Sequence, residues 1–161
     1  MNLDFHSAAA RGLRRYVRLV AAAMDPAVDC AVVQWDHPAN AYLALTGRLH
    51  WFPGDDVALT WDSRYGWAMI LVTRTRRTLF TLRYLGGDLL PAPPAVAAFS
   101  GRIFRDEFAG QADPPPARAT GDVRELVDRL GRYAVPPHCP RRRRVGPVHL
   151  YGVVTSHPGR A

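Results

Sequence analysis

Apolar positions near the N-terminus recur with the period of an α-helix. Between residues 7 and 24, apolar residues such as Leu13 and Val17 fall on one side at about 3.6-residue spacing. Ser7 is a candidate N-cap, and Asp25-Pro26 ends the run because the residue before a proline avoids helical geometry. The pattern predicts a helix over residues 7–24 that lies on a sheet.

The middle of the chain changes to the period of two that is typical of β-strands. Apolar and β-branched residues alternate with polar ones, and short turn sequences rich in Pro, Gly, Asn and Asp separate the segments. The predicted strands are residues 28–35, 41–49, 57–62, 67–73 and 78–85. Connections this short cannot hold crossover helices, so we expect an antiparallel meander.

Two more helices are predicted after the sheet. The first covers about residues 95–109, starts next to Pro94 and is expected to stop at Gly110. The second runs from Thr120, its predicted N-cap, to about Ala134. The predicted fold class is α+β: an antiparallel five-stranded β-meander flanked by one N-terminal and two C-terminal helices, packed mainly on one face.

The length of 161 residues suits one folded domain, which we expect over residues 1–135. Residues 136–161 are rich in Pro and Arg and read as a basic C-terminal tail. Within this tail, residues 148–155 are apolar enough for a short edge strand, with disorder as the alternative.

The positive charge is concentrated in the tail. All 21 basic residues are arginine, and the formal net charge is +7. All 14 acidic residues precede residue 136, and the same segment contains 16 arginines. Residues 1–135 therefore carry a net charge of only +2. The high isoelectric point therefore describes one end of the chain.

Arginine clusters are the candidate contacts for an anion. They bind nucleic acid by releasing condensed counterions, without reading sequence. No aromatic residue interleaves the tail arginines, so base stacking is not expected there, and a solvated tail is the alternative. The candidate contacts are Arg141, Arg142, Arg143 and Arg144 of the tail, with Arg74, Arg76 and Arg77 of a predicted hairpin tip.

A further arginine group lies on the first predicted helix, opposite its apolar side. It consists of Arg11, Arg14, Arg15 and Arg18. A solvated helix face is the simplest interpretation, and a face that binds anions or an acidic membrane is the alternative.

Aromatic residues are concentrated in the predicted sheet. Trp61, Tyr65 and Trp67 belong to one predicted hairpin. Trp, Tyr and Arg are common at the energetic centres of protein interfaces, so these residues are a candidate partner surface. Cross-strand packing in the core is the alternative.

No catalytic, metal or cofactor site is assigned. The six histidines show no HxH or HExxH spacing, so no metal ion is expected. Asp55, Asp56, Asp62 and Asp88 could act as acid and base if they met in one pocket, but Asp is also a common turn residue.

Four segments resemble a family of small actinobacterial proteins known only as a domain of unknown function. They are AYLAL (41–45), FPG (52–54), SRYGWA (63–68) and YLGGDLLP (84–91). The likeness runs from about Arg11 to Tyr133 and is most specific around Gly86-Gly87-Asp88. The family brings no catalytic residues, and the resemblance implies a cytoplasmic actinobacterial protein.

These observations favour a non-enzymatic binding module with a protein-interaction or regulatory role. The first alternative is weak, sequence-nonspecific nucleic-acid binding through the arginine tail, and the second is an enzyme that uses the turn carboxylates. A homodimer formed through an exposed sheet edge is a further possibility. No apolar run is long enough to span a membrane, and no signal peptide is recognised.

Overall fold

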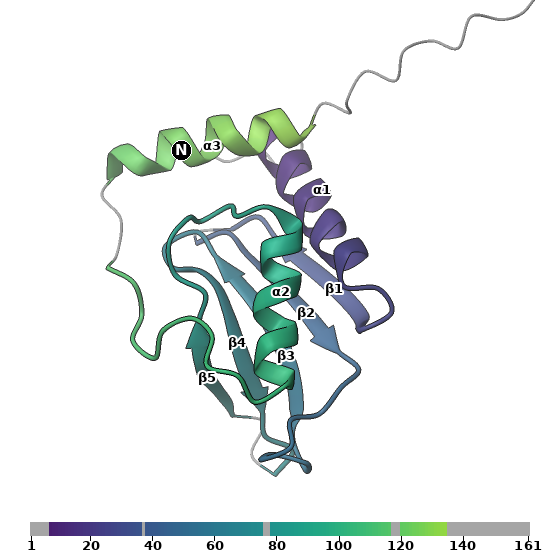
Figure 1. Cartoon of the computed structure of the whole chain (residues 1–161). Helices are drawn as coiled ribbons and strands as arrows, with labels where there is room; N and C mark the ends of the chain where they lie inside the picture. The colour runs from purple at the N-terminus through teal and green to yellow at the C-terminus, as the bar shows by residue number, and fades with distance from the viewer. Residues whose placement is uncertain (1–6, 37, 76–77, 117–119, 135–161) are drawn as a thin grey trace, which may run out of the picture.

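The computed structural model describes residues 7–36, 38–75, 78–116 and 120–134. In this part of the chain a helix precedes five strands, and two helices follow them (Figure 1). The elements are α1 (Ala8–Ala23), β1 (Val28–Gln34), β2 (Asn40–Leu45), β3 (Asp56–Asp62), β4 (Gly66–Val72), β5 (Leu79–Tyr84), α2 (Pro93–Phe104) and α3 (Thr120–Ala134). Among these residues, no helix is both long and apolar enough to cross a membrane.

The sheet confirms the predicted antiparallel meander. Its strand order is β1-β2-β3-β4-β5, and every neighbouring pair is antiparallel. The register places Leu43 opposite Leu59, and Leu59 opposite Met69, so one apolar row crosses the three central strands. All three side chains are fully buried.

Helices α1 and α2 cover this apolar row, which confirms the prediction that helices pack mainly on one face (Figure 1). Ser7 caps α1 as predicted, because its hydroxyl accepts a hydrogen bond from the Ala10 amide at 3.1 Å. The side of α1 that meets the core is fully buried, and it consists of Leu13, Tyr16, Val17 and Val20.

Helix α3 crosses the N-terminal half of α1 beyond the end of the sheet (Figure 1). The crossing is close at Gly12, where an added Cβ would overlap the backbone carbonyl of Leu130. Leu126 and Leu130 of α3 are buried, whereas Val123 near its start is exposed.

Two predicted boundaries were wrong. Strand β2 ends at Leu45 instead of residue 49, because Leu49 turns back to pair with Phe52. Helix α2 ends at Phe104, before the predicted stop at Gly110, and Asp106 then adopts a left-handed conformation with φ of 57°. The candidate strand at residues 148–155 lies outside the described residues.

Candidate binding surfaces

The tryptophans of the predicted partner surface lie in the core. Trp61 and Trp67 are 0% and 1% exposed, so they cannot contact a partner in this fold. They are directly opposite each other on β3 and β4, on the sheet face that the helices cover. Tyr65 is half-buried in the turn between them and packs edge-on against Tyr84, with ring centroids 6.3 Å apart.

Both buried indoles have a polar partner, which is what their burial requires. The Trp61 Nε1–H donates to the Leu89 carbonyl at 2.7 Å, and the Trp67 Nε1–H donates to the Tyr16 hydroxyl at 3.0 Å. Tyr16 in turn donates to the Pro91 carbonyl at 2.7 Å. Desolvation raises the pKa of the Tyr16 phenol well above its ordinary value. These bonds anchor residues 86–91 to the core.

The segment around Gly86-Gly87-Asp88 therefore has a structural role in this fold. Both glycines have positive φ, which non-glycine residues rarely adopt. The Asp88 carboxylate receives two hydrogen bonds from the Arg129 guanidinium of α3, each 2.7 Å long. The segment thus joins the sheet, α1 and α3, and Asp88 is already neutralised by Arg129.

The four turn carboxylates do not all meet in one pocket, because those at the start of β3 are far from the one at its end. Asp55 and Asp56 lie at the start of β3 and Asp62 at its end, about 20 Å away at the usual rise of a strand. Asp62 accepts a hydrogen bond from the Arg64 amide, and Asp88 accepts one from the Leu90 amide. Each of these two acids therefore stabilises its own turn, as Asp commonly does.

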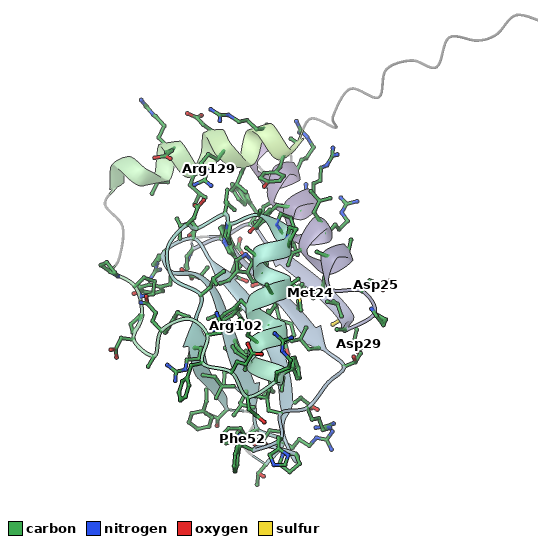
Figure 2. All side chains as sticks on the ribbon, viewed as in Figure 1. Met24, Asp25, Asp29, Phe52, Arg102 and Arg129 are labelled. Atoms are coloured by element: carbon green, nitrogen blue, oxygen red, sulfur yellow. The ribbon has the colours of Figure 1, made fainter. Side chains whose placement is uncertain are left out.

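One end of the sheet carries a group of large exposed apolar side chains. The β2–β3 and β4–β5 connections both lie there, because alternate connections of a meander share one end (Figure 1). Figure 2 labels Phe52 at this end. We call the group the apolar end; it consists of Trp51, Phe52, Leu79 and Phe80, which are 73%, 40%, 59% and 53% exposed.

Tight local structure holds the β2–β3 loop in place. The Leu49 carbonyl accepts a hydrogen bond from the Phe52 amide at 3.0 Å, and the Phe52 carbonyl accepts one from Asp55 at 3.2 Å. Gly47 packs against the Phe104 ring at the end of α2. The Trp51 ring packs edge-on against His50, with centroids 5.1 Å apart. The exposed indole is therefore held on an ordered turn.

An ionic cluster borders the apolar end and joins its two loops. Asp56 pairs with Arg48 at 2.9 Å and with Arg74 at 3.2 Å. The Arg74 hydrogen bond, followed by the charges of both arginines, holds the pKa of the Asp56 carboxyl below its ordinary value. Arg74, a predicted anion contact, thus already has a carboxylate partner. Arg76 and Arg77 fall in the same connection by sequence but lie outside the described residues.

A second surface lies on the outer side of α1. Arg11, Arg14, Arg15 and Arg18 line a shallow hollow of about 420 Å³, together with Leu19 and Ala134. Figure 2 shows nitrogen-tipped side chains projecting outward from the α1 ribbon. Arg11/Arg15 and Arg14/Arg18 are like-charge pairs four residues apart, an arrangement that costs a helix about 0.2–0.5 kcal/mol per pair. We call these four residues the arginine face.

Several predicted contacts cannot be placed. Arg141, Arg142, Arg143 and Arg144 lie outside the described residues, so their contact with an anion stays a prediction. Among the described residues, no three His, Cys, Asp or Glu side chains are grouped as metal ligands would be.

Sequence reasoning did not select the apolar end. Trp51 lies two residues after Leu49 and continues the alternation of the preceding segment, and Leu79 and Phe80 begin a segment that looks like any buried strand. A usable signal was the FPG turn directly after Trp51, because a tight turn exposes its neighbours to solvent.

Comparison with known proteins gives one match. The model of a family of unknown function (DUF6292) matches residues 16–102, which is more than half of the 161 residues. The matched region runs from Tyr16 in α1 to Arg102 near the end of α2 and contains the whole sheet. No curated protein and no solved structure matches the chain.

Proposed function

Because the chain belongs to a family of unknown function, DUF6292, we propose its function from its surface: it is a non-enzymatic module that binds a partner protein at the apolar end. The observation that carries this proposal is the exposure of Trp51, 73%, at the same end of the sheet as three other large exposed apolar side chains. Large apolar side chains exposed at one end of a domain commonly mark an interaction site.

The chemistry of the apolar end indicates what the partner offers. Trp and Phe side chains fill apolar pockets on a partner, and Trp is enriched at the centres of interfaces. The border is positive by sequence, since Arg48, Arg74, Arg76 and Arg77 oppose only Asp55 and Asp56. The complementary partner has an apolar pocket bordered by carboxylates.

Site-specific photo-crosslinking in the source cell tests this proposal. A benzophenone amino acid replaces Trp51 in the full chain, and a second chain carries it at Val123, an exposed apolar position on α3. We expect a covalent adduct with one protein from position 51 and none from position 123. The adduct should weaken at least tenfold when Phe80→Ser or Arg74→Glu is added.

Two results would overturn the proposal. The first is the same set of adducts from positions 51 and 123, which would mean that no surface is preferred. The second is an adduct only with another copy of this chain, supported by light scattering that shows a dimer sensitive to Trp51→Ala. That outcome would replace the partner protein with self-association.

A further inference from the structure

The arginine face is a second binding site, separate from the apolar end. Helix α1 has no acidic residue, and its four arginines lie at positions i, i+3, i+4 and i+7, which is one side of a helix. Together they line one shallow, open hollow. We propose that this hollow binds the sugar–phosphate backbone of a double-stranded nucleic acid.

The dimensions of the site suit a row of phosphates. From Arg11 to Arg18 the helix rises about 10 Å, the length over which one strand of a duplex presents about three phosphates. Arginine binds phosphate through two parallel N–H donors, a geometry that lysine does not offer.

The packing of α1 argues against an acidic membrane as the ligand. A helix that binds at a membrane surface inserts its apolar side among the lipids. In α1 that side is fully buried in the protein core, at Leu13, Val17 and Val20. The accessible side is formed by the arginines with Leu19, which is 40% exposed, so it offers little apolar surface for insertion among lipids.

The lining residues favour a duplex over a single strand. Proteins that hold single-stranded nucleic acid stack its bases on aromatic side chains. Besides the four arginines, the hollow is lined by Leu19 and Ala134, which have no aromatic ring. Contacts to the phosphate backbone alone carry no sequence information, so we expect binding without base preference.

Nucleic-acid binding is therefore proposed on α1 and not on the tail arginines. Ala134 closes the hollow at the end of α3, and Arg141 follows it by seven residues in the sequence. The arginine face of α1 is therefore the proposed site, and the four consecutive tail arginines lie outside the described residues.

Fluorescence anisotropy with a labelled 20-base-pair DNA at 50–200 mM salt tests the proposal. We expect the pair Arg15→Gln and Arg18→Gln to lower the affinity about tenfold or more and the salt slope by about 1.8, since each phosphate contact contributes about 0.9. Arg64→Gln with Arg105→Gln removes the same charge from exposed positions on other elements and should change the affinity less than threefold.

Further variants separate the contribution of positive charge to DNA binding from effects on folding and from the contribution of the tail. Arg15→Lys with Arg18→Lys should recover most of the affinity, and circular dichroism should show the same helix content in all variants. If the double Gln variant fails to fold, Arg18→Gln alone replaces it, because Arg18 is exposed. A chain ending at Val135 should still bind DNA and still respond to the Gln pair. Trp51→Ala should have no effect, which keeps this test independent of the apolar end.

Four outcomes would overturn the inference. They are no DNA binding at 50 mM salt, loss of binding on tail removal with no effect of the Gln pair, tighter binding of a single strand than of the duplex, and binding of phosphatidylserine vesicles without binding of DNA.

Discussion

Tyr16 shows how one side chain can join three separate parts of the chain. It lies on α1, its hydroxyl accepts a hydrogen bond from Trp67 of β4, and it donates one to Pro91 ahead of α2. The bond with Trp67 is buried and the bond with Pro91 is partly buried. Removal of the hydroxyl therefore leaves the buried Trp67 donor and the partly buried Pro91 acceptor without their partner.

We expect Tyr16→Phe to lower the free energy of unfolding at pH 7 by about 1–3 kcal/mol, the usual cost of buried unsatisfied polar groups. Urea denaturation followed by circular dichroism measures this loss. Phe104→Tyr, which adds a hydroxyl to a half-buried ring outside this network, is a control for altered aromatic content.

The same residue predicts a pH dependence. Burial raises the pKa of Tyr16 in the folded state, while an unfolded tyrosine ionises near pH 10. The folded protein therefore keeps its proton to higher pH, and this stabilisation is complete below about pH 10 and is lost as the pH rises. We expect the stability difference between the wild type and Tyr16→Phe to shrink as the pH rises above about 10. A difference that stays constant would contradict the assigned burial.

The roles of individual side chains were the feature hardest to predict from the sequence. Alternation places Trp61 on the same strand face as Val57 and Leu59, but a period of two does not say which face the helices cover. The hydrogen bonds of Trp61 and Trp67 depend on residues far along the chain, 28 and 51 positions away. Such partners leave no local signal.

At the scale of elements, the closest contact is the crossing of α1 and α3 at Gly12. A methyl group there would overlap the Leu130 carbonyl, so the two helices would have to move apart. Asp88 and Arg129 join α3 to the loop after the sheet through a second, independent contact. Helix α3 is thus held at two places, both of which use residues outside its own segment.

Two glycine-to-alanine substitutions provide a matched test of this crossing. Gly12→Ala should destabilise the protein by about 1–3 kcal/mol, the usual cost of overpacking. Gly131→Ala, on the facing helix with open space around it, should instead stabilise by up to about 1 kcal/mol through helix propensity. Chemical denaturation compares the two, and equal effects would mean that the helices do not cross at Gly12.

The elements themselves were largely predictable because their signals are local. The spacing of α1, its Ser7 cap, and the short turns of the meander gave the helix, the strands and their order. The errors fell at boundaries, where tertiary contacts decide. Phe104 ends α2 next to Gly47, and no local pattern in residues 95–109 indicates this stop.

At the scale of the whole molecule, the buried core and part of the positive charge lie in different segments of the chain. The core includes residues from Ala9 to Leu130, whereas five of the 21 arginines follow residue 135. The family match covers the sheet but begins after Arg11, Arg14 and Arg15. The matched region therefore contains the whole sheet and the apolar end, but of the arginine face it contains only Arg18.

We expect a chain that ends at Val135 to unfold with the same midpoint and cooperativity as the full chain, within about 0.5 kcal/mol. The reason is that all residues of the described core lie between Ala9 and Leu130. Parallel thermal and urea denaturation of both chains measures this. A clearly less stable short chain would show that the tail packs on the domain, which would contradict the predicted boundary near residue 135.

The unequal burial of the tryptophans has an optical consequence. Trp35, Trp61 and Trp67 lie in the interior, and Trp51 projects into water from the apolar end. Emission from the first three reports the state of the core, while the red-shifted, quencher-accessible part of the spectrum comes from Trp51. The protein thus contains an intrinsic probe at the surface where we place its partner.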